Sequence, residues 1–344
     1  MTRTTWMFAA VIFASAALTA NASPVYSNFV TFSGPGNNGG GTTANAISNA
    51  GTIAGFSSDN ATTPTLFTNF VLNPNQTFTT LNVFGDPLAN ANGINSGGTV
   101  VGSSGGNAFY LNSGTSGFLP PVSPGNTASE TAFGINDHNT IVGQFVDNGT
   151  GTTPGFVYSA GGTFTILNPV VNAAVTNAQS INDNGIVAGF YSTDGVHQHG
   201  FLYNTNTGQY TLAPDPSQPN LVLVQFLGIN DQGIVAGYWQ DAGGNQHGLL
   251  YNINTQTYTF LDDPNAAISG GIEITQITGI NDSGEIEGFY VSSATGLQSG
   301  FYATPDASTV PEPASGFLFA GGMLMVVALQ SMRRRQGCSL TVRF

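Results

Sequence analysis

The chain contains 344 residues, of which only 7% are charged, whereas an ordinary soluble domain has about 25% charged residues. Eighteen acidic residues are opposed by five arginines and no lysine, so the formal net charge is −13. All five arginines lie near the two ends of the chain, and every acidic residue lies between them. A middle region without Lys or Arg cannot neutralise nucleic-acid phosphates, so nucleic acid is excluded as a partner.

The rest of the composition favours a folded domain without disulfide bonds. Hydrophobic residues make up 40% of the chain, with 24 Phe and 11 Tyr, which is enough apolar surface for a core. The single cysteine, Cys338, has no second cysteine with which to pair. An exported protein of this kind needs another means of holding its ends together.

Residues 1–22 are predicted to be a secretory signal peptide. Arg3 supplies the positive start, and an apolar run follows from residue 6 to residue 18. Ala20 and Ala22 provide the small-x-small cleavage pattern, so we expect cleavage after Ala22. The alternative is an N-terminal membrane anchor, for which the apolar run is short.

Six repeats occupy the middle of the chain, from residue 23 to residue 304. Each repeat contains a shared isoleucine that precedes a turn rich in Asn, Asp and Gly. These isoleucines lie between 41 and 51 residues apart, at positions 47, 94, 135, 181, 229 and 280. Four short β-type runs, separated by turn residues, make up each repeat, and no helical periodicity is present. Repeats of this size predict an all-β, six-bladed β-propeller of four-stranded repeats.

The two ends of the repeat region predict how the ring closes. The sixth repeat contains three strand-like runs, and its fourth run is missing before Pro305. Residues 28–35 near the N-terminus are similar to the fourth run of the fifth repeat at residues 258–264. We therefore expect the N-terminal strand to complete the last blade.

Four of the repeat turns carry an Asn-Asp pair, for which two interpretations are open. Carboxylate and amide oxygens are suited to Ca²⁺, although one carboxylate per turn is far short of a full coordination shell. The other interpretation is an Asx turn, in which the side chain accepts backbone N–H groups. No cofactor is otherwise indicated. The candidate turn residues are Asn136, Asp137, Asn182, Asp183, Asn230, Asp231, Asn281 and Asp282.

Three histidines, His197, His199 and His247, fall near the connections between second and third strands, together with Asp194 and Asp241. A shared metal or acid–base site is one interpretation. However, His199 and His247 occupy equivalent positions one blade apart, which favours structural or solvent-facing roles.

Catalytic motifs are absent from the sequence: no G-x-S-x-G, H-E-x-x-H or Walker pattern occurs, and no catalytic residue is assigned. Glu285 and Glu287 share one face of a predicted strand. Two like charges on one face predict exposure to solvent or to a cation.

The C-terminal region has three parts in a fixed order. A linker over residues 305–315 is followed by an uncharged run over 316–332, which predicts one transmembrane helix, and by a basic tail over 333–344. The positive-inside rule places the basic tail in the cytoplasm. The residues that define the order are Val310, Pro311, Glu312 and Pro313, followed by Arg333, Arg334 and Arg335.

This order resembles the PEP-CTERM sorting signal. The resemblance implies an inner-membrane precursor that an exosortase-type protease of a Gram-negative bacterium processes, with release to the cell surface or exopolysaccharide matrix. The tail beyond residue 335, which contains Cys338, is longer than such signals usually have. The alternative is a permanent C-terminal anchor.

The repeats over residues 134–303 also resemble the extracellular HAF-family repeat, with residues 199–201 the best match and the first repeat the most divergent. That resemblance implies a cell-surface context and no reaction. The sequence therefore predicts an exported, non-enzymatic surface or matrix protein that binds polysaccharide or a surface partner. The alternative is a secreted propeller hydrolase or lyase that acts on polysaccharide.

Overall fold

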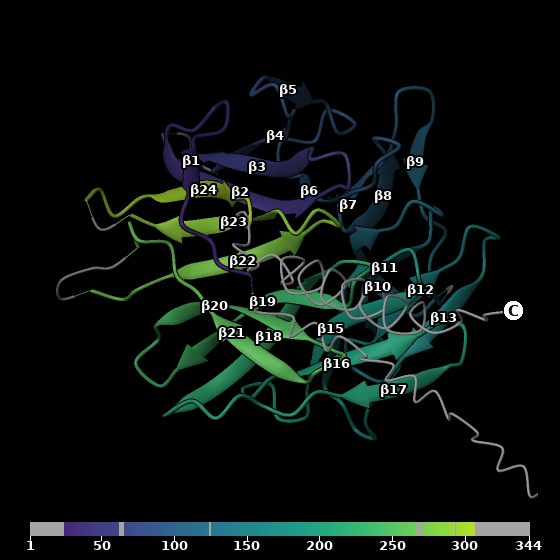
Figure 1. Cartoon of the computed structure of the whole chain (residues 1–344). Helices are drawn as coiled ribbons and strands as arrows, with labels where there is room; N and C mark the ends of the chain where they lie inside the picture. Colours follow the sequence, from purple (N-terminus) through teal and green to yellow (C-terminus); the bar gives the residue numbers. More distant parts are fainter. Residues whose placement is uncertain (1–23, 62–64, 124, 267–270, 293, 307–344) are drawn as a thin grey trace, which may run out of the picture.

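The computed structural model describes residues 24–61, 65–123, 125–266, 271–292 and 294–306. Twenty-four strands in these residues form six four-stranded antiparallel sheets, which are arranged around a central axis (Figure 1). The prediction of an all-β, six-bladed propeller is confirmed. The predicted signal peptide, the sorting residues and the transmembrane segment at 316–332 lie outside the described residues. No helix in the described part of the chain is long and apolar enough to cross a membrane.

The first five blades follow the chain, and the sixth combines its two ends. Blade 1 contains β2 (Gly39–Ile47), β3 (Ile53–Asp59), β4 (Leu66–Leu72) and β5 (Phe78–Leu81). Blade 2 contains β6 (Asn90–Ile94), β7 (Val100–Ser104), β8 (Asn107–Leu111) and β9 (Ser116–Phe118). Blade 3 contains β10 (Thr127–Ile135), β11 (Ile141–Asp147), β12 (Gly155–Tyr158) and β13 (Phe164–Leu167).

The remaining blades have the same four-strand plan. Blade 4 contains β14 (Val175–Ile181), β15 (Ile186–Ser192), β16 (His199–Asn204) and β17 (Gln209–Leu212). Blade 5 contains β18 (Leu221–Ile229), β19 (Ile234–Asp241), β20 (Gln246–Asn252) and β21 (Thr257–Phe260). Blade 6 contains β22 (Thr275–Ile280), β23 (Ile286–Val291), β24 (Gln298–Ala303) and β1 (Phe29–Phe32).

The hydrophobic core lies between neighbouring blades. Ala188 and Leu202 of blade 4 pack with Val224 and Phe226 of blade 5 in one buried cluster, and similar clusters fill the other junctions. Strands with apolar side chains on both faces form because each inner strand is covered by a neighbouring blade on either side. The burial of each blade therefore depends on the next one.

At the axis the first strands approach one another closely, and blades 2, 3, 5 and 6 have Gly at the contact position. A Cβ added to Gly228 would lie 2.8 Å from the Cα of Gly279 in the next blade. Gly134 faces Ser180 in the same way, at 2.8 Å from its Cα. Real Cβ atoms do not approach backbone atoms this closely, so the ring can contract only where these positions carry small residues.

The ring closes through the N-terminal strand, as the sequence predicted. The purple β1 lies beside the yellow-green β24 in Figure 1, and the two pair antiparallel from Phe29 opposite Ala303 to Phe32 opposite Gly300. A Cβ on Gly300 would lie 2.6 Å from the ring of Phe32, so the glycine makes room for that ring. At the last described residue, the N–H of Asp306 donates to the carbonyl oxygen of Val25 at 2.7 Å. Backbone pairing thus joins the two ends without a covalent bond.

The predicted exposure of Glu287 is wrong, because its side chain is completely buried. It pairs with Gly279 of β22 at a position where the other five blades have Ala or Val. Both carboxyl oxygens lie 3.0 Å from Oγ1 of Thr278, which in turn lies 3.0 Å from the carbonyl oxygen of Ala44 in blade 1. We call this junction of blades 6 and 1 the closure seam.

Burial raises the pKa of Glu287 to about 8, against the lowering effect of the Thr278 hydroxyl. The neutral carboxyl group suits the geometry. The hydroxyl group of Thr278 has one proton, which it can donate either to the carbonyl oxygen of Ala44 or to Glu287. When Glu287 is protonated, it donates to Oγ1 of Thr278, and the hydroxyl proton is free to pair with Ala44. A protonated Glu287 therefore completes a hydrogen-bonded path across the closure seam.

Replacement of Glu287 by Gln is expected to change how stability depends on pH. In the parent chain the unfolded state releases this proton above its ordinary pKa of 4.5, whereas the folded state retains it up to about 8. The parent chain therefore loses stability as pH rises from about 5 to about 8, and E287Q lacks this part of the loss. Melting temperatures measured across that range check the prediction.

The matched control is Glu285→Gln, which removes a partly buried carboxylate two residues away. E287Q is expected to melt several degrees above the parent chain at pH 8 and close to it at pH 5. Equal differences between E287Q and the parent chain at both pH values would contradict the assignment.

Candidate functional site

The Asn-Asp turns that the sequence singled out gather at one end of the propeller axis. In each case the Asn side chain closes its own turn: Oδ1 of Asn182 accepts the N–H of Ile186 at 2.8 Å, and Oδ1 of Asn230 accepts the N–H of Ile234 at 2.9 Å. These side chains are buried, and Gly185 and Gly233 follow with positive φ. The local geometry is that of an Asx turn.

The same Asn residues also join neighbouring blades, which the sequence analysis did not foresee. Nδ2 of Asn182 donates to the carbonyl oxygen of Asn230 at 2.9 Å, so one side chain closes its own turn and holds the next. Five such links run in one direction around the axis. Their donors are Asn95, Asn136, Asn182, Asn230 and Asn281, at 3.1, 3.0, 2.9, 3.1 and 3.4 Å from the next carbonyl oxygen.

The Asp residues form a second, parallel series of links. The N–H of Asp137 donates to Oδ1 of Asp183 at 2.8 Å, and the N–H of Asp183 donates to Oδ1 of Asp231 at 2.9 Å. Asp231 donates in the same way to Asp282 at 2.8 Å, and Asp282 to Asn49 at 3.0 Å. Each carboxylate is therefore held by a backbone donor of the preceding blade.

This arrangement brings like charges together without a Lys or Arg among the described residues. Burial raises the pKa of Asp183, and the carboxylates of Asp137 and Asp231 raise it further, whereas the N–H of Asp137 and the nearby His138 lower it. Nδ1 of His138 lies 3.6 Å from Oδ1 of Asp183. We call the six turns between the first and second strands of the blades the turn ring; they are residues 48–52, 95–99, 136–140, 182–185, 230–233 and 281–285. The turn ring is thus an electronegative surface that backbone donors stabilise.

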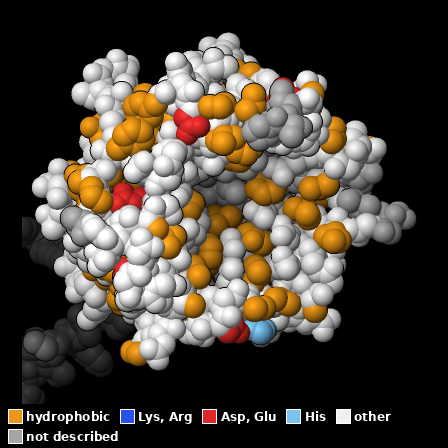
Figure 2. All heavy atoms as spheres, turned by 180° about the vertical axis from the view of Figure 1, so that it is seen from behind, with side chains coloured by type: hydrophobic (Ala, Val, Ile, Leu, Met, Phe, Trp, Pro, Cys, Tyr) orange, Lys and Arg blue, Asp and Glu red, His pale blue; other side chains and the backbone are white. Residues whose placement is uncertain are grey.

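The turn ring surrounds an axial cavity of about 70 Å³, lined by the turns and by first-strand residues of the blades. That volume holds a few water molecules and is well below the 300–1,000 Å³ typical of small-molecule sites. Figure 2 shows one face of the whole propeller, with a hollow at its centre that hydrophobic side chains line. The axial cavity therefore suits water or a small ion better than an organic substrate.

The histidines that the sequence singled out are paired within their own blades. Nδ1 of His199 lies 2.9 Å from Asp215, and Nδ1 of His247 lies 3.0 Å from Asp262. Both aspartates follow the fourth strand of their blade. Asp241, which the sequence places in the same connection as His247, caps its own loop by accepting the N–H groups of Gly243 and Asn245.

His197 is exposed and contacts Asp194 at 2.6 Å, within the same loop. The three histidines therefore do not share one site.

A larger cavity, which sequence reasoning missed, lies at the closure seam. We call it the seam groove; its volume is about 280 Å³. Blade 1 contributes Asn49, Asn73, Pro74 and Gln76, and blade 6 contributes Ser283, Glu285 and Tyr302. Its two walls are at least 207 residues apart in the sequence (Gln76 to Ser283), so only ring closure brings them together.

The seam groove combines an aromatic ring with amide and carboxylate groups. Nδ2 of Asn281 donates to Oε2 of Glu285 at 2.7 Å, which holds the carboxylate in place. The same oxygen would lie 3.5 Å from a Cβ added to Gly51, so the glycine keeps this part of the groove open. Gln76 has φ of 65° and is exposed at the groove edge.

Comparisons with known proteins identify the fold alone. No protein-family model matches the chain, and none of the curated proteins matches it. A putative TolB from Agrobacterium tumefaciens has a TM-score of 0.50 and 11% identity, over 77% of this chain and 91% of that one. Streptogramin B lyase has a TM-score of 0.43 and 12% identity, over 80% and 97% of the two chains. TolB from Acinetobacter baumannii has a TM-score of 0.43 and 11% identity over 76% of this chain, which spans about half (55%) of that protein.

Replacement of Asn182 by Ala is expected to lower the free energy of unfolding by about 2–4 kcal/mol, because it leaves the N–H of Ile186 and the carbonyl oxygen of Asn230 without their partner in a buried turn. Urea denaturation measures the change. The matched control is Asn184→Ala in the same turn. Its side chain is exposed and donates to the carbonyl oxygen of Asp231 at 3.1 Å, so the expected loss is about 1 kcal/mol or less. Equal losses for the two variants would contradict a role for the turn ring in holding the blades together.

Proposed function

We propose that this chain is an exported, non-enzymatic surface or matrix protein that binds neutral polysaccharide in the seam groove. The observation that carries the proposal is the composition of that groove, which offers an aromatic side chain, three amides and one carboxylate within a volume of about 280 Å³. That volume lies just below the range of small-molecule sites and accommodates about one or two sugar units.

Sugar recognition needs groups of these kinds. The apolar face of a sugar ring packs against an aromatic side chain such as Tyr302, while hydroxyl groups pair with amides and carboxylates such as Asn73, Gln76 and Glu285. Uronic acids and sulfated sugars are ordinarily held by cationic side chains, and the described residues contain no Lys or Arg. The groove therefore favours a neutral sugar.

Export is the second part of the proposal. Its support is the sequence pattern at the two ends, namely the signal-peptide pattern with Ala20 and Ala22 and the PEP-type order from Val310 to Arg335. On this proposal the precursor is anchored briefly in the inner membrane, and an exosortase-type protease releases the propeller. A domain with no Lys or Arg and a formal charge near −18 then faces the matrix.

A polysaccharide hydrolase or lyase is the second candidate. It is favoured by one observation, that aspartates from four different blades line the axial cavity and that the pKa of Asp183 is raised. Against it, the cavity volume of about 70 Å³ does not admit a sugar ring, and backbone donors already hold one oxygen of each carboxylate. Non-catalytic binding in the seam groove is therefore the preferred proposal.

Replacement of Gln76 by Ala is expected to weaken binding of a neutral oligosaccharide about fivefold, which corresponds to the loss of about one hydrogen bond. Glycan-array screening with neutral and acidic oligosaccharides identifies the probe, and titration calorimetry measures the affinity. Turnover of the same probe is followed by reducing-end release.

The control is Gln256→Ala, at the equivalent turn of blade 5, where φ is 55°. Both variants remove Gln from a left-handed position, so they share any effect on folding, and only Q76A is expected to lose affinity. Equal binding by the two variants would count against the seam groove, and turnover by the parent chain that Asp183→Asn abolishes would favour the enzyme.

Export is tested by mass spectrometry of the mature protein recovered from the producing cells and their matrix. The expected C-terminus lies close to Pro311–Pro313, and the expected N-terminus is residue 23. Replacement of Arg333, Arg334 and Arg335 by Gln is expected to reduce the amount of processed protein, because the basic cluster orients the segment. Recovery of the propeller only with residue 344 still attached would instead indicate a permanent anchor.

A further inference from the structure

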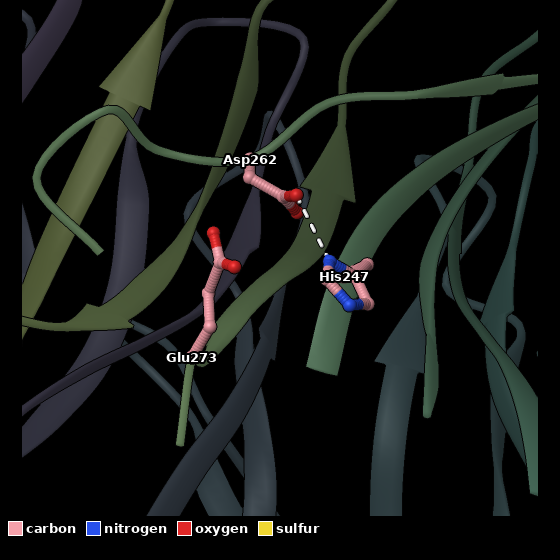
Figure 3. Close-up of side chains that lie close together, drawn as sticks. All are labelled: His247, Asp262 and Glu273. Atoms are coloured by element: carbon pink, nitrogen blue, oxygen red, sulfur yellow. Dashed lines mark hydrogen bonds and ion pairs between the residues drawn. The ribbon is translucent and has the colours of Figure 1, made fainter. Parts of the chain in front are cut away.

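A cluster of three potential metal ligands lies at the junction of blades 5 and 6, away from the seam groove (Figure 3). His247 is in β20, Asp262 follows β21, and Glu273 precedes β22 of blade 6. One nitrogen or oxygen atom from each side chain lies within 4.8 Å of the other two, and all three residues are partly buried. Three separate segments therefore converge on one point.

The imidazole and the first carboxylate are held in place by their surroundings. Oδ2 of Asp262 lies 3.0 Å from Nδ1 of His247, while Oδ1 accepts the N–H of Gly248 at 3.0 Å. The imidazole stacks on the indole of Trp239, with ring centroids 4.6 Å apart and an angle of 24° between the planes. His247 and Asp262 are thus oriented before any ligand binds.

The second carboxylate is fixed by its backbone. The N–H of Glu273 donates to Oδ1 of Asn245 at 3.0 Å, and its carbonyl oxygen accepts the N–H of Gln246 at 2.8 Å. Glu273, which lies in the segment between blades 5 and 6, is thereby attached to the hairpin that carries His247. In Figure 3 the Glu273 side chain extends toward Asp262 and His247.

The charges at this cluster call for a cation. Two carboxylates lie beside one imidazole, and the described part of the chain has no Lys or Arg that could neutralise them. Partial burial reduces the screening that water provides between like charges. A bound cation would remove the repulsion that the fold imposes.

We propose that His247, Asp262 and Glu273 bind a divalent transition-metal ion of the Zn²⁺ or Mn²⁺ class. One imidazole nitrogen with two carboxylate oxygens is a ligand set for these ions, whereas Ca²⁺ and Mg²⁺ favour oxygen alone. Bonds of about 2.1 Å in a tetrahedral site require ligand atoms about 3.4 Å apart, so a small rotation of the side chains completes the site. Three protein ligands leave a position open for water or a hydroxyl group.

Blade 4 provides a comparison within the same molecule. His199 pairs with Asp215 at 2.9 Å and packs against Tyr191, as His247 does with Asp262 and Trp239. The residue before each histidine forms a parallel β-bridge to the next blade, Gln198 to Leu223 and Gln246 to Ile274. Glu273 precedes Ile274, so its equivalent in the other pair is Val222, which precedes Leu223. Blade 4 therefore has two of the three ligands, and its variants serve as controls.

The test is a titration with Zn²⁺ or Mn²⁺ alone, in the full chain carrying Trp6→Phe, so that Trp239 is the only tryptophan. Calorimetry is expected to give one ion per chain, and Trp239 fluorescence is expected to change with the same midpoint because the indole stacks on a ligand. His247→Asn and Glu273→Gln are each expected to weaken binding at least tenfold. His199→Asn and Asp215→Asn are expected to leave it unchanged.

Other outcomes would overturn the proposal. One is the absence of saturable metal binding up to 1 mM. The other is an equal loss of metal affinity in the blade 4 and blade 5 variants, which would indicate dispersed binding by surface histidines and acids. Melting curves of the variants without metal separate a loss of ligands from a loss of folding. Since no sugar is present, a failure of this test is distinct from a failure of the polysaccharide proposal.

Discussion

The close approach of the six first strands at the axis is the constraint on which the rest of the structure depends. A side chain on Gly228 would collide with the backbone of Gly279 in the next blade, and one on Gly134 would collide with the backbone at Ser180. With the backbones this close, the turns that follow these strands come within hydrogen-bond distance of one another. The turn ring and the axial cavity follow from this contact.

The same contact explains how an acidic propeller is held together although its described residues contain no Lys or Arg. In most proteins a buried or crowded carboxylate is paired with Lys or Arg. Here the partner is the peptide N–H of the preceding blade, as in the links from Asp137 to Asp183 and from Asp183 to Asp231. Because a peptide donor carries no net charge, the surface stays strongly negative while the geometry remains satisfied. At the cluster around Glu273 two carboxylates converge with one peptide donor, the N–H of Gly248 that Asp262 accepts, and a cation would have a large effect there.

Much of the fold could be predicted from the sequence, because the information repeats. An isoleucine followed by a polar turn recurs six times, and the missing fourth strand of the last repeat has a counterpart near residue 30. The sites could not be predicted in the same way, because they depend on contacts between blades. Glu287 appeared to be exposed because strand periodicity does not reveal that a neighbouring blade covers that face. The partners of His247 could not be named from the sequence, since Asp262 and Glu273 approach it only after the sheets are packed.

The turn ring also has a beginning and an end, although the propeller is closed. The links start at Asn95 of blade 2 and stop at Ser48 of blade 1. The hydroxyl group of Ser48 closes its own turn by accepting the N–H of Thr52. Serine has no side-chain amide that could donate to the next blade. The link is shortest in the middle of the series, at Asn182, and longest at Ser48. Hydrogen bonds in a series strengthen one another, so the interior members gain most and the terminal members least. Axial restraint is therefore graded around a fold that looks symmetric: the turn ring is open between blades 1 and 2, and Asn45 of β2 bridges that junction instead by donating to the carbonyl oxygen of Ala91 at 2.8 Å.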